Sequence, residues 1–323
     1  MVTPTLRFDG QVAVISGAGG GLGRQYALLL ASRGAHIVVN DIGGSVTGDG
    51  SDHSAADAVA EEILALGAEA IADHHSVTSP EGGQAIIDAA VGAWGRVDIL
   101  INNAGIVRDA RFEDITPERL DPLVDVHLKG AFNLTRPAWK VMREQRYGRI
   151  LNTCSAAGLL GAERMSNYGA AKTGLVGLTR VLAAEGADSD IKVNALAPIA
   201  QTRMLQHSVD TAPQQDDADA QPILEELAGE YLQKLDPALV APVAVFLTHR
   251  DCPVSGEIYT AGAGQVSRFF IGRTKGFHNP ELSVEDVHAH LAEIRDEAGY
   301  TVPGGPADEM AELFAAIIAP GPA

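Results

Sequence analysis

The chain has 323 residues, 46% of them hydrophobic and 5% aromatic, which is enough for one large α/β domain or two small ones. Its 24 Lys and Arg against 42 Asp and Glu give a formal net charge of −18, which argues against nucleic acid and against an anionic membrane as partners. The two cysteines, Cys154 and Cys252, have no metal-ligand spacing, and no apolar run reaches the roughly 18 residues of a membrane span, so we expect a soluble, cytoplasmic protein without a disulfide framework or a metal site.

A glycine-rich turn follows the first predicted strand. Residues 11–15 (QVAVI) form a short apolar run typical of a buried parallel strand, and a helical pattern over 24–33 begins after the sequence SGAGGGLG. Strand, glycine turn and helix in this order are the context that a dinucleotide-binding fingerprint requires. The glycines let the backbone approach a pyrophosphate, which then meets the N–H groups at the helix start. We therefore predict cofactor contacts at Gly17, Gly21, Leu22 and Gly23.

The second predicted strand, 35–40, ends at Asp41. A carboxylate at this place accepts hydrogen bonds from the adenosine ribose hydroxyls and repels a 2′-phosphate, which favours NAD over NADP as the cofactor. Arg24 is the open alternative, because a basic residue near the glycine turn can accommodate that phosphate. After a helix predicted over 55–66 and a strand over 68–73, Ser76 and Val77 are the expected contacts of the adenine.

Two asparagines end the strand predicted over 97–101. Asparagine side chains at a strand end can cross-link neighbouring strands, and the glycine in the sequence NNAG lets a cofactor lie close to the backbone. Asn103, Ala104 and Gly105 are therefore predicted cofactor contacts. The next predicted helix, 120–145, carries His127 on an otherwise apolar stripe.

Three residues further along the chain indicate acid–base chemistry. A strand over 148–154 places Ser155 at its carboxyl end, and Tyr168 and Lys172 lie one turn apart on one face of the following helix. A lysine charge near a tyrosine favours the phenolate and is expected to lower the tyrosine pKa, so that Tyr168 exchanges a proton with an alcohol or carbonyl near neutral pH. Ser155 can donate a hydrogen bond to the same substrate oxygen.

Strands and helices alternate through this region, with further strands predicted over 191–197 and 257–260. This order predicts an α/β fold: a single Rossmann-type doubly wound parallel sheet with helices on both faces. Ligands bind such sheets at the carboxyl ends of the strands. The glycine turn, Asp41, Asn102 and Ser155 all fall at that edge, so the residues predict one shared binding site.

The assembled motifs resemble those of the short-chain dehydrogenase/reductase family over roughly residues 8–264. SGAGGGLG is similar to the family's TGxxxGxG with Ser16 in place of threonine, and NNAG is unaltered. Ser155, Tyr168 and Lys172 match the family's catalytic serine and YxxxK. The resemblance implies that these three residues are catalytic and that Tyr168 and Lys172 also contact NAD. It further implies that Pro198 and Thr202 lie at the nicotinamide.

Within this family, the segments VVNDIGG, VHLKGAFNLTRPAW and GLVGLTRVLAAEG are similar to the (3R)-hydroxyacyl-CoA dehydrogenase domain of peroxisomal multifunctional enzymes of type 2, which is also known as type 4 17β-hydroxysteroid dehydrogenase. The resemblance implies NAD-dependent oxidation of a 3-hydroxyacyl-CoA to the 3-oxoacyl-CoA in fatty-acid or sterol side-chain β-oxidation. Oxidation of a free 17β-hydroxysteroid is the alternative. A catalytically silent dinucleotide-binding regulator is a more remote one.

The family's catalytic tetrad usually includes an asparagine where this chain has His127. The resemblance implies that this histidine is a variant member of the proton relay, and a packed core histidine is the competing interpretation. Family members commonly dimerise or tetramerise through the helices that carry His127 and Tyr168, so a homodimer or homotetramer is expected. The apolar face compatible with this contact consists of Leu175, Val176, Leu178, Thr179 and Leu182.

The resemblance divides the chain into a Rossmann-fold dehydrogenase domain, 1–264, and a C-terminal extension, 265–323, that packs on the core or on a neighbouring subunit. Within the first domain, 201–236 is expected to be a variable, strongly acidic substrate lid. The extension contains a capping box at Ser283–Asp286 and a last helix over 307–318. Its basic residues either contact CoA phosphates or, together with Phe269 and Phe270, dock the tail. They are Arg268, Arg273 and Lys275.

Overall fold

The computed structural model describes residues 5–211 and 234–318 of the chain. The chain divides into two compact units, Met1–Arg268 and Phe269–Ala323. Most of the acidic segment predicted to form a substrate lid, 212–233, lies outside the described residues. Within the described ranges, no helix has the length and apolar character needed to cross a membrane.

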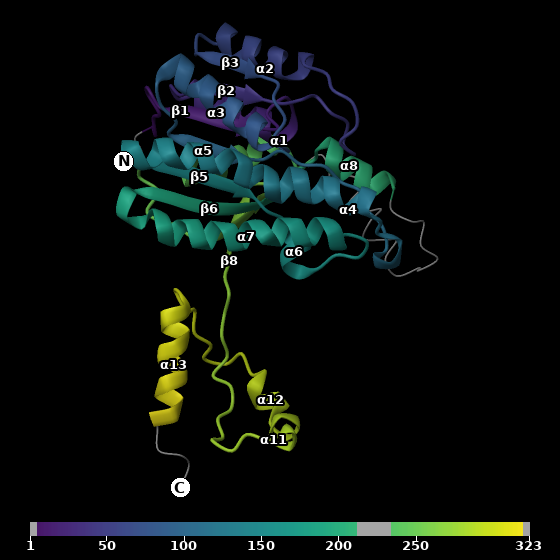
Figure 1. Cartoon of the computed structure of the whole chain (residues 1–323), viewed down its shortest axis with the longest axis vertical. Coiled ribbons are helices and arrows are strands. Elements are labelled where there is room, and N and C mark those ends of the chain that lie inside the picture. Colours follow the sequence, from purple (N-terminus) through teal and green to yellow (C-terminus); the bar gives the residue numbers. More distant parts are fainter. Residues whose placement is uncertain (1–4, 212–233, 319–323) are drawn as a thin grey trace. The chain divides into compact units, whose positions relative to one another are not determined.

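A sheet with the strand order β3-β2-β1-β4-β5-β6-β7-β8 forms the centre of the first unit (Figure 1). The strands are β1 (Val12–Ser16), β2 (His36–Asn40), β3 (Ala70–Asp73), β4 (Ile99–Asn102), β5 (Gly148–Thr153), β6 (Ile191–Pro198), β7 (Ile258–Gly262) and β8 (Gln265–Phe269). From β3 to β7 each strand pairs in parallel with its neighbour. The strand order reverses between β1 and β4, so the predicted doubly wound sheet is confirmed.

Helices connect these strands. In the first unit they are α1 (Gly21–Ser32), α2 (Ser54–Ala65), α3 (Pro80–Trp94), α4 (Pro117–Val124), α5 (Gly130–Gln145), α6 (Ala156–Leu160), α7 (Ser166–Gly186), α8 (Arg203–Asp210) and α10 (Ala241–Leu247). Shorter turns are η1 (Phe112–Asp114), η2 (Asp125–Lys129), η3 (Ala187–Ser189) and η6 (Pro237–Leu239). The alternation of strands and helices is the one that the sequence predicts.

The two faces of the sheet are covered by different helices, because successive side chains of a strand point to opposite faces. On one face, Ala13 and Ile15 of β1 belong to an apolar core with α1, α2 and α10. On the other face, Val12 and Val14 pack with α3 and α5. All four side chains are fully buried. A sheet buried on both faces leaves its strand ends as the place where a ligand can enter.

The helix predicted over 120–145 is a helical run from Pro117 to Gln145 that contains a π turn. α4 ends at Val124, η2 is a π-helical turn, and α5 begins at Gly130. A π turn inserts one extra residue into a helix, and such turns are frequent at functional sites. Hydrophobic periodicity does not locate this turn, because the apolar stripe continues on both sides of it. The turn contains His127, whose side chain is 2% exposed.

The sequence predicts a subunit contact through one apolar face of α7, and this prediction is wrong for most of the residues on that face. Leu175, Val176 and Thr179 are buried within the chain itself. The exposed side of this helix carries Thr173, Gly177 and Val181. The apolar pattern is therefore accounted for by the packing of α7 within its own subunit.

The second unit contains α11 (Val284–Ala289), α12 (Leu291–Ile294) and α13 (Pro306–Ile318). The predicted capping box is confirmed: the Ser283 hydroxyl accepts from the N–H of Asp286, and the Asp286 carboxylate accepts from the N–H of Ser283. The helical segment that begins at this capping box is divided between α11 and α12. Where this unit packs stays a prediction.

Candidate active site

Close backbone contacts shape the glycine turn between β1 and α1. Gly17 has a φ of +67°, and a Cβ there would lie 2.8 Å from Cα of Ala104. At Gly23 a Cβ would lie 2.2 Å from the carbonyl oxygen of Gly17. Gly20, in contrast, faces open space, and α1 begins with neither a capping side chain nor an acidic residue in its first turn. Uncapped N–H groups beside open space suit a pyrophosphate, so this turn fits the predicted dinucleotide.

The end of β4 is cross-linked to this turn, as the two asparagines predict. The Asn103 side-chain amide donates to the carbonyl oxygens of Ser16 (3.1 Å) and Gly17 (3.0 Å). The Ser16 hydroxyl accepts from the N–H groups of Asn103 and Ala104, both at 3.1 Å. Asn103 therefore holds the turn in place through its side chain. The backbone of Ala104 lies against Gly17, where no side chain fits between them.

Asp41 also holds the glycine turn. Its carboxylate accepts from the N–H of Gly19 at 2.9 Å and from the N–H of Gly43 at 2.7 Å. Arg24, the alternative contact for a 2′-phosphate, instead forms a bidentate pair with Glu62 at 2.6 to 3.0 Å. A guanidinium held by a carboxylate in this way is a poorer phosphate contact. The arrangement favours NAD.

The loop after β3 lies against the start of α5. The Asn133 side chain donates to the carbonyl oxygen of Val77 at 2.8 Å, and a Cβ on Gly130 would lie 2.9 Å from Cγ2 of Val77. The Ser76 hydroxyl shares a 2.9 Å hydrogen bond with Thr78. These contacts fix the loop, and its role as the adenine contact stays a prediction.

At the other side of the site, Thr202 lies across from the glycine turn. Its Cγ2 is 3.6 Å from the position that a Cβ on Gly21 would take. The Thr202 hydroxyl caps α8 by accepting from the N–H of Leu205, and the carboxyl end of β6 at Pro198 leads into this segment. Thr202, the residue expected to contact the nicotinamide, thus lies at the same edge of the sheet as the glycine turn.

Ser155 and Tyr168 meet at the end of β5. Ser155 is the residue before α6 and its hydroxyl accepts from the N–H of Ala157 at 3.2 Å. The same hydroxyl is near enough to the phenol of Tyr168 to lower its pKa. Tyr168, only 8% exposed, sits in an apolar cluster with Ile106, Val107 and Leu123. The predicted meeting of hydroxyl and phenol is present in the structure.

The expectation that Lys172 lowers the pKa of Tyr168 is wrong for the protein alone. Burial raises the pKa of Tyr168 to about 12, against the hydrogen bond from Ser155, which lowers it. Burial also lowers the pKa of Lys172 to about 8. The Lys172 ammonium donates to the carbonyl oxygen of Thr153 at 2.7 Å. Sequence spacing places the two groups on one helix face, but it does not reveal the loss of solvation that dominates both.

His127 packs against Tyr168 from the π turn. The two rings meet edge to face, with centroids 5.3 Å apart and an interplanar angle of 84°. Nε2 of His127 lies 2.8 Å from the carbonyl oxygen of Ile106, and a Cβ on Gly105 would lie 2.6 Å from Cε1. Burial, together with the charge of Lys172, lowers the pKa of His127 well below its ordinary value. Burial thus disfavours the charged form of this ring, which packs beside the phenol, and its role as a relay residue stays a prediction.

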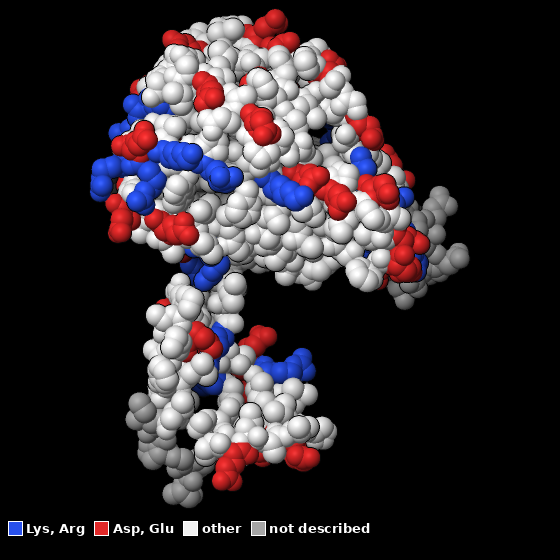
Figure 2. Space-filling model, viewed as in Figure 1, with Lys and Arg blue, Asp and Glu red and all other residues white. Residues whose placement is uncertain are grey.

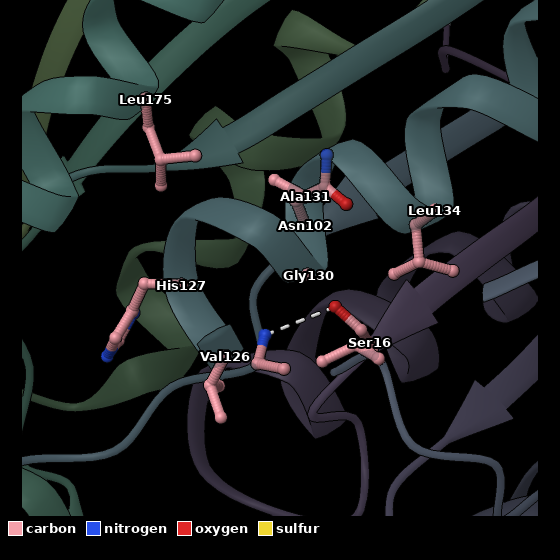
Figure 3. Close-up of a pocket in the computed structure, with 10 residues that line it drawn as sticks. Ser16, Asn102, Val126, His127, Gly130, Ala131, Leu134 and Leu175 are labelled. Carbon is pink, nitrogen blue, oxygen red and sulfur yellow. Dashed lines mark hydrogen bonds between the residues drawn. The ribbon is translucent and has the colours of Figure 1, made fainter. Parts of the chain in front are cut away.

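A small cavity of about 10 Å³ lies between this π turn and the sheet (Figure 3). His127, Gly130 and Leu134 line it from the helix side, and Ser16 and Asn102 from the strand ends. Its size admits at most a single water molecule. This space is too small to hold any part of a substrate.

Asn167 is a residue of this site that the sequence analysis misses. Its side-chain amide donates to the carbonyl oxygens of Arg108 and Arg119, both at 3.0 Å, and its side-chain oxygen accepts from the N–H of Tyr168 at 2.8 Å. The residue is 2% exposed. Its position just before the tyrosine is the one available signal, but its partners lie 59 and 48 residues away.

Comparison with known proteins places these features in context. Residues 11–213 match the family model described as short chain dehydrogenase. The peroxisomal hydratase-dehydrogenase-epimerase of Saccharomyces cerevisiae is 44% identical over 296 residues, which are 91% of this chain and 31% of the yeast protein. The full-length peroxisomal multifunctional enzyme type 2 from Drosophila melanogaster superposes with a TM-score of 0.76 at 33% identity, over 96% of this chain and 50% of that one.

A solved 7α-hydroxysteroid dehydrogenase complexed with NADH and 7-oxo glycochenodeoxycholic acid is 30% identical, with a TM-score of 0.68 over 80% of this chain and 95% of that one. This chain thus spans a third to a half of the two peroxisomal relatives and nearly the whole length of the hydroxysteroid dehydrogenase.

Proposed function

This chain belongs to the short-chain dehydrogenase family, and we propose that it oxidises a 3-hydroxyacyl-CoA to the 3-oxoacyl-CoA with NAD as the acceptor. It is an oxidoreductase by family. The finer assignment draws on its resemblance to the dehydrogenase part of peroxisomal hydratase-dehydrogenase-epimerases and of multifunctional enzyme type 2.

The observation that carries the proposal is the meeting of Ser155 and Tyr168 beside the uncapped start of α1, all at the carboxyl edge of one sheet. A phenol paired with a hydroxyl can exchange one proton with an alcohol, and a helix amino end can hold the pyrophosphate of a dinucleotide. The two capabilities together serve hydride transfer from an alcohol.

The proposed mechanism assigns one task to each group. NAD, when bound at the glycine turn, would supply the acceptor for the hydride of the carbinol carbon. Tyr168 takes the hydroxyl proton in its phenolate form, which burial disfavours in the protein without ligands, while Ser155 donates a hydrogen bond to the same oxygen. Lys172 keeps a positive charge on the Tyr168 side of the site, and Asp41 accepts hydrogen bonds from the adenosine ribose.

The remaining predicted contacts keep supporting tasks in this proposal. Gly17, Gly21 and Gly23 let the turn approach the pyrophosphate, and Thr202 meets the nicotinamide carboxamide. His127, neutral and packed on the phenol, positions Tyr168 rather than relaying its proton.

The test compares a 3-hydroxyacyl-CoA with 17β-estradiol as substrates, each with NAD, by the appearance of NADH absorbance. We expect turnover of the thioester and its loss, by about a hundredfold or more, in Tyr168→Phe. The Tyr168 hydroxyl makes only a 3.9 Å contact with the sulfur of Met204 and the bond to Ser155, so the variant should fold. Turnover of the steroid alone would replace the thioester with the alternative substrate.

The same proposal includes a cytoplasmic location and a homodimer or homotetramer. The relatives named above carry the word peroxisomal in their names, so fractionation of cells that make this chain decides between the two compartments. Sedimentation measures the oligomeric state.

A further inference from the structure

The basic residues of the C-terminal extension, proposed from sequence as CoA contacts, are occupied by carboxylates. Arg268 pairs with Glu257 at 2.7 Å. Arg273 pairs with Glu309 at 2.8 Å and with Glu312 at 2.7 Å. These ion pairs make Arg268 and Arg273 poorer phosphate contacts than arginines without a carboxylate partner.

A second group of basic residues, Arg136, Lys140 and Arg143, forms a row along the exposed side of α5 (Figure 2). A row on an open helix surface offers charge but no enclosing wall, and charges there are screened by salt within about 8 Å. It lacks the concavity that a small-molecule site requires.

A pocket of about 460 Å³ in the first unit combines charge with concavity. Arg108, Arg119, Arg164 and His207 line it, together with three carboxylates, those of Asp49, Asp109 and Glu118. The three arginines of the lining balance its three carboxylates, whereas the whole chain has 24 basic against 42 acidic residues, so the lining is less negative than the rest of the chain. Its volume falls in the range of small-molecule pockets.

The pocket adjoins the apolar cluster around Tyr168 through four separate chain segments. Val46, Val107, Met165 and Met204 belong to the apolar cluster. In each segment, a residue one to three positions before or after the cluster residue lines the pocket. The corresponding pocket residues are Thr47, Arg108, Arg164 and His207. A substrate that reacts at Tyr168 would therefore find an apolar wall beside the phenol and, next to that wall, the guanidinium groups of Arg108 and Arg164.

Two of the arginines are held in place by backbone carbonyls. Arg108 donates to the carbonyl oxygens of Thr47 (2.8 Å) and Glu118 (2.7 Å), and Arg119 donates to that of Asp109 (3.1 Å). Asn167 binds the carbonyl oxygens of both arginines and the N–H of Tyr168. The buried side chain of Asn167 thus links the two arginine segments of the pocket to the backbone of Tyr168.

Arg164 is the arginine most able to bind an anion. It forms no salt bridge in the part of the chain that the structure describes, although its charge acts on Asp109. Its φ is +63°, a left-handed conformation that is rare for a residue with a side chain and that often marks functional sites. The carbonyl oxygen of Arg164 is anchored by the N–H of Ala110 at 2.9 Å.

We propose that this pocket binds the phosphate groups of the thioester's CoA moiety, with Arg164 as the main contact and Arg119 and His207 beside it. The inference rests on the proposed function and names the part of the site that distinguishes a CoA thioester from a neutral steroid. Arginine suits this task because its planar fork gives two parallel hydrogen bonds to a phosphate.

The experiment uses one 3-hydroxyacyl chain carried on three thiols: CoA, phosphopantetheine and phosphate-free pantetheine. We expect Arg164→Met to raise KM for the CoA thioester about tenfold to a hundredfold, as the loss of a charged hydrogen bond implies, and to leave KM for the pantetheine thioester within about twofold. Arg164→Lys should recover part of the loss. Arg250→Met, which removes an exposed arginine that does not line the pocket, is the matched control.

The outcomes separate the two levels of the proposal. A KM change that extends to the phosphopantetheine thioester supports binding of its single phosphate, and a change confined to CoA supports binding of the ADP phosphates. Equal KM increases for CoA and pantetheine thioesters in Arg164→Met would overturn the phosphate site while the dehydrogenase stands. Turnover of none of the three thioesters would instead reject the proposed function.

Discussion

Lys172 donates a 2.7 Å hydrogen bond to the carbonyl oxygen of Thr153, at the last residue of β5. The ammonium is 5.7 Å from the centroid of the Tyr168 ring and almost completely buried. A buried charge with a single hydrogen-bond acceptor of this kind lowers the stability of the fold, a cost that the proposed catalytic role of Lys172 would explain.

Replacing this lysine should separate the two properties. Burial lowers the pKa of Lys172 from 10.5 to about 8, which corresponds to about 3 kcal/mol against the charged form. Near neutral pH we expect the free energy of unfolding of Lys172→Met to be about 1 to 3 kcal/mol higher than that of the wild-type protein, and its melting temperature to rise accordingly. We also expect the variant to lose most of its dehydrogenase activity. Thermal unfolding and initial rates measure both effects.

The pH dependence of this difference follows from the sign of the shift. Below about pH 8 the lysine is charged in both the folded and the unfolded chain, so its full cost is present. Between about 8 and 10.5 the unfolded chain binds more protons, and the wild-type protein gains stability as the pH rises. The advantage of Lys172→Met should shrink over this window. A constant difference across it would contradict a buried charge.

We expect His127 to make the stability of the fold sensitive to acid. Its pKa is lowered well below 6.5, mainly by burial, so the unfolded chain takes up a proton there that the folded chain does not. The wild-type protein should therefore lose about 1.4 kcal/mol per pH unit relative to His127→Asn as the pH falls below about 6.5. Urea unfolding at a series of pH values measures this slope. His288→Asn, an exposed histidine in α11, should leave the slope unchanged.

We expect Asp41 to determine the choice between NAD and NADP. Its carboxylate holds Gly19 and Gly43 and is placed to repel a 2′-phosphate. In Asp41→Ser we expect the ratio of kcat/KM for NAD to that for NADP to fall by about tenfold to a hundredfold. Asp9→Ser, which removes an exposed carboxylate paired with Arg7, is the control. An unchanged ratio would assign cofactor choice to another residue.

We expect Asn167 to position Tyr168, so that its replacement affects kcat beyond what a loss of stability explains. Asn167→Ala removes three hydrogen bonds and should destabilise the fold by about 1 to 3 kcal/mol. Asn167→Asp keeps the size of the side chain and its acceptor for the N–H of Tyr168 but turns a carboxylate toward two carbonyl oxygens. We expect kcat to fall in both variants with KM for NAD unchanged. Full kcat in Asn167→Asp would show that the phenol needs no such anchor.

The sequence predicts the parts of this site that are encoded locally. Strand, glycine turn and helix lie within 11–33, and Ser155, Tyr168 and Lys172 lie within 155–172. Asn167, Asp109 and Arg164 are not predicted, because their roles come from contacts between segments dozens of residues apart. The pKa shifts of Tyr168 and Lys172 are missed for a related reason, since burial is a property of the whole fold.

The close approach of Gly105 and His127 has a consequence for the history of this site. A Cβ on Gly105 would come within 2.6 Å of the imidazole ring, and packed interiors do not tolerate such an overlap. The two positions are therefore linked in the order in which they can change. A lineage that acquires histidine at 127 can no longer exchange glycine at 105, whereas one that first shortens the side chain at 127 regains that freedom. A side chain at position 105 should therefore destabilise the fold when residue 127 is histidine and be better accommodated when residue 127 is smaller.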